Sequence, residues 1–173
     1  MTRFVIPLIA VILFFLEPIF SLFSPIEKNG ELFVFVPRFL IVYLIFIAAY
    51  YSRQRAILYG FILGLLYDMY HIDIIGLYTF MYPLICYVST LVIRQIQRHT
   101  FTVMVLSLVM IVLLELLSYL FASIIALTSI DFNEFLTSRL LPTVIANSLF
   151  IVMFGWTFKQ ITTKRFNQKQ AGF

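Results

Sequence analysis

The chain has 173 residues, 62% of them hydrophobic and 12% charged, and its formal net charge is +4. Because soluble domains average roughly 25% charged residues, this composition excludes a soluble globular protein and indicates an integral membrane protein. Spans of about 20 residues use nearly all of the length, so no soluble domain of useful size remains. The single cysteine, Cys86, lies in an apolar stretch and cannot by itself build a disulfide framework or a thiolate metal cluster.

Hydropathy predicts a six-transmembrane-helix bundle, all α-helical, as one polytopic domain over residues 1–173. The expected spans are residues 4–23, 33–51, 56–70, 74–93, 101–127 and 139–158. The first span is expected to be retained, because no small-x-small cleavage pattern follows it. A short polar loop is expected over residues 24–32. The third span is short for a full crossing, at about 1.5 Å of rise per residue against a hydrocarbon core of about 30 Å.

Lysines and arginines predict the orientation of the bundle, because basic residues in short loops stay on the cytoplasmic side. Nine lie on the side of the two termini, namely Arg3, Arg53, Arg55, Arg94, Arg98, Lys159, Lys164, Arg165 and Lys169. Three lie on the other side, namely Lys28, Arg38 and Arg139. The acidic loop residues share that second side, namely Glu27, Glu31, Asp73, Asp131 and Glu134. Both termini are therefore predicted to be cytoplasmic, and the basic inner surface suits anionic lipid headgroups and needs no nucleic acid.

The stretch over residues 56–78 carries the most specific pattern in the chain. Gly60, Gly64 and Asp68 are spaced four apart, which places them on one face of a helix. Two glycines at this spacing expose bare backbone, so a helix of this chain or of another chain can approach closely. Asp68 then lies in the same interface. Since a carboxylate in hydrocarbon costs about 2.5 to 3.5 kcal/mol, we expect a cation to pair with Asp68, and Arg38 is the first candidate.

A second group of polar residues lies in or beside the expected spans. These residues are Glu17, Arg38, Asp68 and Arg139 in the outer half, His71 and Asp73 just beyond Asp68, and Glu115 and Asn147 near mid-membrane. They could converge on a polar cavity that opens to the outer leaflet, since charges at such depth often mark substrate or partner pathways. They could equally form ion pairs and interhelical hydrogen bonds that lock the helices together. The residues alone leave both interpretations open.

Catalytic and metal-binding patterns are weak in this sequence. Asp68, His71 and Asp73 form a D-x-x-H-x-D string of metal-ligand types, but three ligands on a helix end and a loop need supporting residues that the sequence does not show. A nucleophile elbow, a phosphate-binding glycine loop and a zinc-protease helix are all absent from the sequence. We therefore expect no catalytic residue, no metal site and no cofactor.

The pattern Gly60-x-x-x-Gly64-Leu65-x-x-Asp68, followed by Gly76-Leu77-Tyr78, resembles the signature region of the rod shape-determining protein MreD family. The length, the six-span layout and the basic turn before the third span are also similar. The resemblance implies a fold akin to the substrate-binding subunits of energy-coupling-factor vitamin transporters. It also implies a place in the bacterial cell membrane, in the machinery of lateral cell-wall synthesis. The partners that it implies are the bitopic protein MreC, the MreB filament, RodA and a class B penicillin-binding protein. The family motif covers Gly60, Gly64, Asp68 and Gly76.

Two classes of function fit these features. A non-catalytic scaffold that binds an MreC-like partner and helps to organise peptidoglycan synthesis fits a chain with glycine packing faces and no catalytic constellation. A small-molecule or lipid-binding transport subunit of the energy-coupling-factor type fits the charged groups in the outer half. The sequence favours the scaffold, and an intramembrane enzyme is the least favoured reading.

Overall fold

The computed structural model describes residues 4–28, 31–72, 75–96 and 98–170. Its helices are α1 (Val5–Ser21), α2 (Phe39–Tyr50), α3 (Arg53–His71), α4 (Leu77–Gln95), α5 (Thr100–Ile124), α6 (Phe132–Glu134), the π-helix η2 (Phe135–Leu140) and α7 (Leu141–Gln170). Two short strands, β1 (Ile26–Lys28) and β2 (Glu31–Phe33), pair antiparallel with Ile26 opposite Phe33. Apart from this hairpin, the regular structure of the described chain is helical, which confirms the all-α class.

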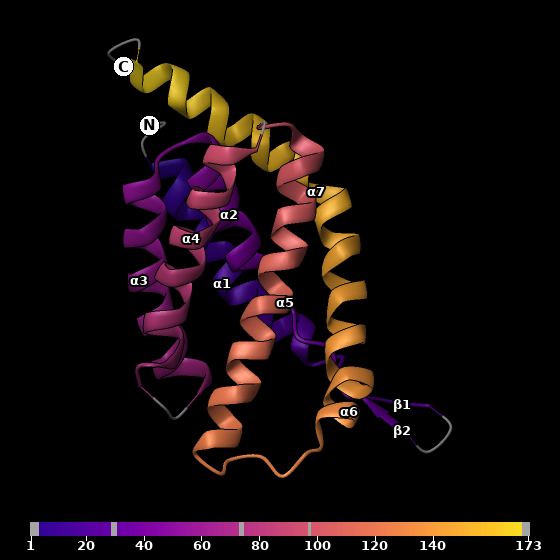
Figure 1. Ribbon diagram of the computed structural model, residues 1–173. Coiled ribbons are helices and arrows are strands. Elements are labelled where there is room, and N and C mark those ends of the chain that lie inside the picture. The colour runs from indigo at the N-terminus through magenta and orange to yellow at the C-terminus, as the bar shows by residue number, and fades with distance from the viewer. Residues whose placement is uncertain (1–3, 29–30, 73–74, 97, 171–173) are drawn as a thin grey trace.

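The helices pack as a bundle with α2 in its interior. The start of α1 and the end of α7 lie at one end of the bundle, while the end of α3, the start of α4 and α6 lie towards the other (Figure 1). α2 packs against α1, α3, α4, α5 and α7, and all residues from Phe39 to Ile47 are buried. A helix that is hydrophobic all round is typical of a buried core helix or a membrane span, and here other helices cover α2. α2 is therefore the core element, and its ends are fixed by the helices around it.

The expected second span, residues 33–51, is wrong in its first part. α2 begins at Phe39, and residues 34–38 are not helical. Pro37 has no backbone N–H and disfavours a helical conformation in the residue before it. The neighbouring helices bond this backbone instead: the Val34 N–H donates to the Ser138 carbonyl at 2.8 Å, and the Val36 N–H donates to Thr143 Oγ1 at 3.0 Å. Irregular backbone is tolerated at membrane depth only where protein satisfies it in this way.

Three other expected boundaries also need correction. Residues 24–32, expected as a polar loop, contain most of the β-hairpin. α3 covers 19 residues and starts at Arg53, so it rises about 29 Å, but it is not among the described helices that are both long and apolar enough to cross a membrane. α7 continues to Gln170, well past residue 158. Hydropathy marks the apolar part of a helix, whereas its polar last turns are good helix formers that hydropathy does not detect.

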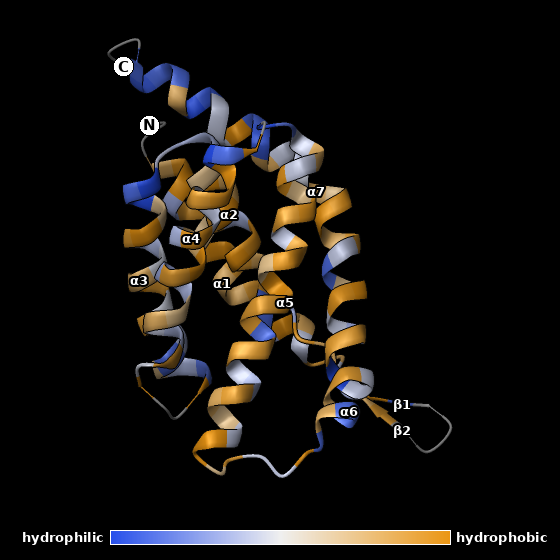
Figure 2. Ribbon diagram, viewed as in Figure 1, coloured by the Kyte–Doolittle hydropathy of each residue, from blue (hydrophilic) through white to orange (hydrophobic). Residues whose placement is uncertain are grey.

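Within the described ranges, three helical segments are long and apolar enough to cross a membrane, namely α4, α5 and the continuous stretch Phe132–Gln170. α1 and α2 are apolar but shorter, at 17 and 12 residues. Figure 2 shows hydrophobic residues along the middle of the bundle and a mostly hydrophilic end of α7. The apolar helices fit a membrane protein, while the count of six spans stays a prediction.

Candidate functional site

Gly60 and Gly64 lie on the face of α3 that packs against α4. A Cβ added at Gly64 would lie 2.8 Å from the carbonyl carbon of Tyr78, and one added at Gly60 would lie 3.2 Å from backbone atoms of Tyr82 and Pro83. Because these neighbours are backbone atoms, they cannot rotate away. The two glycines therefore permit the close approach of α3 and α4, and the helix that covers them belongs to this chain.

Asp68 is fully buried and caps the N-terminus of α4. Its Oδ1 accepts from the Tyr78 N–H at 2.8 Å, and its Oδ2 accepts from the N–H groups of Gly76 and Thr79, both at 2.9 Å. The Thr79 hydroxyl donates to Oδ2 at 2.7 Å. Unpaired N–H groups and the positive end of the helix dipole satisfy a carboxylate at this position. The expected pairing of Asp68 with Arg38 is wrong, because these local donors bind both carboxylate oxygens and Arg38 pairs with another acid.

Gly76 forms the turn that leads into α4. Its φ is +116°, in the left-handed region where glycine is favoured over other residues. Apart from its chain neighbours, no atom of the described residues lies within 4 Å of a Cβ built at Gly76, so glycine is required there for its backbone conformation. Gly60, Gly64, Asp68 and Gly76 therefore all serve one unit, the α3–α4 hairpin. This hairpin in turn sets the positions of Tyr67 and Tyr78.

Arg38 lies at the start of α2 and pairs with Glu115 of α5. Both side chains are buried; the Arg38 Nε donates to Oε1 at 2.7 Å, and Nη2 lies 2.7 Å from the same oxygen. Arg139 of η2 donates from its Nε to Glu115 Oε2 at 3.2 Å. Each oxygen of Glu115 thus faces one arginine. We call Arg38, Glu115 and Arg139 the arginine cluster; it joins α2, α5 and η2, three elements that are far apart in sequence.

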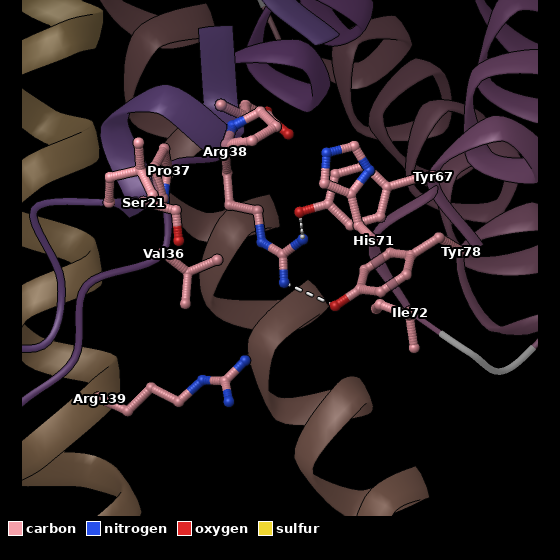
Figure 3. A pocket seen from close by; sticks show the side chains of 12 residues that line it. Ser21, Val36, Pro37, Arg38, Tyr67, His71, Ile72, Tyr78 and Arg139 are labelled. Atoms are coloured by element: carbon pink, nitrogen blue, oxygen red, sulfur yellow. Dashed lines mark hydrogen bonds between the residues drawn. The ribbon is translucent and has the colours of Figure 1, made fainter. Parts of the chain in front are cut away.

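Two tyrosines from the α3–α4 hairpin complete the surroundings of Arg38 (Figure 3). Its Nη2 donates to the Tyr78 hydroxyl at 2.7 Å and its Nη1 to the Tyr67 hydroxyl at 3.4 Å. The Arg38 guanidinium also lies over the Tyr78 ring, 4.8 Å from the ring centroid. A buried guanidinium is tolerated when its charge is paired and its donors are bonded. The hairpin and the arginine cluster are therefore physically connected through these tyrosines.

Glu17 and Asn147 hold the non-helical backbone before α2. Glu17 of α1 is buried, and its Oε1 accepts from the N–H of Leu40 in the first turn of α2 at 2.8 Å. Asn147 of α7 accepts from the Arg38 N–H at 2.8 Å and donates to the Val36 carbonyl at 2.9 Å. These contacts explain how α2 can start inside the bundle. The second carboxylate oxygen of Glu17, Oε2, has no hydrogen-bond partner within the described ranges.

A polar cavity of about 310 Å³ lies beside these residues. Its polar lining comes from α1, the start of α2, the end of α3, the start of α4 and η2, namely from Glu17, Ser21, Arg38, Tyr67, His71, Tyr78 and Arg139. Of the polar residues grouped from the sequence, the structure brings Glu17, Arg38, Glu115, Arg139 and Asn147 together around the start of α2. Asp68 lies within the hairpin instead.

The D-x-x-H-x-D string is only partly described by the structure. Asp73 lies outside the described residues, and His71 stacks on Tyr67 with ring centroids 4.4 Å apart. Among the residues that the structure describes, no group of three or more histidines, cysteines, aspartates or glutamates could hold a metal ion. His71 is placed here as an aromatic wall of the polar cavity.

Sequence reasoning missed Tyr67, Tyr78 and Thr143 as members of this site. Tyr67 directly precedes Asp68, and Tyr78 belongs to the Gly76-Leu77-Tyr78 pattern, so both were near residues already singled out. Thr143 and Asn147 are four apart on α7, which is the spacing of one helix face. That spacing was the available signal for an α7 face that binds an extended backbone.

Comparisons with known proteins bear on the identity of the chain. A family model described as rod shape-determining protein MreD matches residues 2–164. The rod shape-determining protein MreD of Bacillus subtilis (strain 168) is 32% identical over 149 residues, which cover 85% of this chain and 86% of that protein. The cell shape-determining protein MreD of Streptococcus pneumoniae is 31% identical over 122 residues, covering 70% of this chain and 74% of that protein. No solved structure matches the chain, so the expected likeness to vitamin-transporter subunits stays a prediction.

Proposed function

The chain belongs to the rod shape-determining protein MreD family, and we propose that it is a non-catalytic membrane scaffold of the cell-wall elongation complex. Family membership supports a role in determining rod shape. The proposal adds that the chain binds a bitopic MreC-like partner in the bacterial cell membrane. Through that partner it helps to organise lateral peptidoglycan synthesis, beside MreB, RodA and a class B penicillin-binding protein.

The observation that carries this proposal is the use that the chain makes of its family-motif residues. Gly60 and Gly64 admit the α4 backbone, Asp68 caps α4, and Gly76 forms the turn before it. These motif residues pack helices together and cap a helix, whereas a catalytic group needs access to a reacting atom. Their placement therefore supports a structural role better than a catalytic one.

The partner is expected to contact a face other than the glycine strip, because α4 already covers that strip. Exposed apolar side chains lie on several outer helices, among them Phe15 of α1, Phe61 of α3 and Leu149 of α7. In a bilayer such positions meet lipid or the helix of another protein. We propose that the single helix of the MreC-like partner packs on one of these outer faces.

Co-purification and cell shape together test the scaffold. The intact chain, extracted in mild detergent, should bring an MreC-like membrane protein with it, and depletion of the chain should make rod-shaped cells round. A folded chain that recovers no such partner, or depleted cells that stay rod-shaped, would contradict the proposal. Gly64→Leu serves as a control for folding: it should lose partner and monodispersity together, because the strip is internal.

The polar cavity favours a second candidate, a transport subunit of the energy-coupling-factor type. Ligand sites are concave and carry a few convergent polar groups, and this cavity has both properties. Such a subunit should purify with a small molecule and with an ATPase partner. Recovery of an ATPase with the chain would favour transport, whereas recovery of a single-span membrane protein without one favours the scaffold.

We also propose that both termini lie in the cytoplasm. The support is the excess of basic residues at the end of the bundle where α1 begins and α7 ends. A cytoplasm-active reporter fused after Phe173, or within residues 94–99, should be active, and the same reporter within residues 26–31 should be silent. Activity of the reporter within residues 26–31 would contradict the proposed orientation.

A further inference from the structure

We propose that the polar cavity binds the headgroup of an amine-bearing phospholipid, with the amine on Glu17 and the phosphate on Arg139. The proposal concerns what the chain binds by itself and does not rest on the scaffold function. At about 30 Å³ per water in the liquid, a cavity of about 310 Å³ has room for a group of roughly ten non-hydrogen atoms. A phosphoethanolamine group is of this size.

One acid beside the cavity, Glu17, forms no salt bridge within the described chain. Glu115 binds both arginines of the arginine cluster. Glu17 is 2% exposed; its Oε1 accepts from the Leu40 N–H of α2, and its Oε2 has no donor among the described residues. Leaving a buried carboxylate oxygen without a donor is costly, and an ammonium group would supply a charge-assisted bond. Because Oε2 has almost no accessible surface, the amine reaches it by rotation of the carboxyl group about its terminal bond, which also moves Oε1 relative to the Leu40 N–H.

Arg139 supplies the opposite charge at the same cavity. Its side chain is 39% exposed, and its Nε binds Glu115. Its two Nη groups make no hydrogen bond within the described chain, and Figure 3 shows the guanidinium pointing towards Arg38 and Tyr78. A guanidinium with free N–H groups matches the geometry of a phosphate. An acceptor for an amine and a donor for a phosphate therefore face one cavity, which is the complement of a zwitterion.

A second cavity favours a lipid over a free zwitterion. This cavity, of about 200 Å³, shares Ile72, Tyr78 and Arg139 with the polar cavity. Its other walls are largely apolar and include Phe121 and Phe135. An amphiphile can place its headgroup in the first cavity and the start of an acyl chain in the second, with its phosphate at the arginine between them. A free zwitterion has no group for the apolar cavity.

Binding to lipids of matched acyl chains tests the proposal. The purified full-length chain in detergent is titrated with phosphatidylethanolamine, phosphatidylcholine and phosphatidylglycerol, and each complex is quantified by native mass spectrometry. Like phosphatidylethanolamine, phosphatidylcholine carries a cationic nitrogen and a phosphate, but its nitrogen has no N–H to donate. Phosphatidylglycerol carries the phosphate and has no amine. We expect phosphatidylethanolamine to bind about tenfold more tightly than either, the range of one charge-assisted hydrogen bond. O-phosphoethanolamine, which lacks acyl chains, should not displace the lipid at equal concentration.

Glu17→Gln isolates the amine contact. The glutamine oxygen can still accept from the Leu40 N–H, so the α2 cap is kept, but the second carboxylate oxygen becomes an NH₂ donor. The variant should bind phosphatidylethanolamine and phosphatidylcholine equally. Glu134→Gln, which changes an exposed acid of α6, is the matched control and should keep the preference. Arg139→Gln should weaken phosphatidylethanolamine and phosphatidylcholine to the same degree, because both carry the phosphate.

Several outcomes would overturn the proposal. Equal binding of phosphatidylethanolamine and phosphatidylcholine would show that the amine makes no contact with Glu17. An unchanged preference for phosphatidylethanolamine in Glu17→Gln would show the same. Displacement by O-phosphoethanolamine at equal concentration shows a site for a free zwitterion. If no lipid is preferred, and Glu17→Gln abolishes recovery of a protein partner while the bundle stays monodisperse, a partner side chain occupies the cavity instead.

Discussion

Asp68 and Glu115 are both fully buried acids, yet the chain satisfies them in different ways. Asp68 is bonded by backbone N–H groups 8, 10 and 11 residues further along the chain. Glu115 is bonded by arginines 77 and 24 residues away in sequence. The first arrangement needs only the α3–α4 hairpin, whereas the second needs α2, α5 and η2 to be in place. The hairpin is thus a local unit, and the arginine cluster joins distant parts of the bundle.

The largest effect is expected when the hairpin itself is forced open. Gly64→Ala places a Cβ against the Tyr78 carbonyl, and because backbone must move, we expect a cost of about 3 kcal/mol, at the upper end for overpacking. Thermal unfolding in detergent, followed by light scattering, measures it. Gly155→Ala is the matched control, because its Cβ would meet mainly the flexible end of Met104. Equal melting temperatures for the two variants would show that the stability of the bundle does not depend on the close approach of α3 and α4.

Removal of the local cap should have the next largest effect. Asp68→Ala leaves the N–H groups of Gly76, Tyr78 and Thr79 without their acceptor, and we expect a loss of about 2 to 3 kcal/mol. Asp68→Asn keeps one oxygen acceptor and should lose roughly half as much. The same unfolding assay checks both. If the alanine variant is no less stable than the asparagine variant, the cap is not what holds Asp68.

Of the two tyrosine hydroxyls that link the hairpin to the arginine cluster, the Tyr78 hydroxyl makes the shorter bond. Tyr78→Phe removes the acceptor of the 2.7 Å bond from Arg38, and hydrogen bonds to charged groups contribute about 1.5 kcal/mol or more. Tyr82→Phe is the control, because the buried Tyr82 hydroxyl has no partner within the described ranges. Removal of the Tyr82 hydroxyl should leave the free energy of unfolding unchanged or raise it. If the Tyr78→Phe variant is as stable as the Tyr82→Phe variant, the Tyr78 hydroxyl does not couple the hairpin to the arginine cluster.

The smallest effect is expected at the exposed arm of the cluster. Arg139 is 39% exposed, and water screens its attraction to Glu115, so Arg139→Ala should cost about 1 kcal/mol or less. Melting at low and high salt checks this assignment, because the difference from the unmodified chain should shrink as salt rises. A loss as large as that of a buried pair would mean that Arg139 is closed off from solvent in the membrane.

The sequence predicted the local region better than the distant one, and the reason is physical. Gly60, Gly64 and Asp68 share a helix face by spacing alone, so their common interface could be predicted. The partner of Asp68 could not, because hydropathy treats a buried acid as a charge that needs a cation and does not count the free N–H groups of the next helix. The prediction therefore paired Arg38 with Asp68, because both were expected towards the outer side on helices adjacent in sequence.

The remaining errors come from interactions that join distant segments. Pro37 was visible in the sequence, but the bonds from Thr143 and Asn147 that stabilise a non-helical segment depend on where α7 lies. Likewise, Glu115 and Arg139 were singled out as polar residues in spans, yet their pairing depends on the angle between α5 and η2. Periodicity within a helix predicts which residues share a face of that helix. It gives no information on which distant helix packs against that face.

The central claim is that Arg38 is held by Glu115 and not by Asp68. Two double-mutant cycles on unfolding free energy in detergent test it, one with Arg38→Ala and Glu115→Ala, the other with Arg38→Ala and Asp68→Ala. We predict a coupling of about 2 to 3 kcal/mol for Arg38 and Glu115, because removal of either partner leaves a buried charge. For Arg38 and Asp68, which share only contacts to Tyr78, we predict about 1 kcal/mol or less. A larger coupling for Arg38 and Asp68 than for Arg38 and Glu115 would contradict the account.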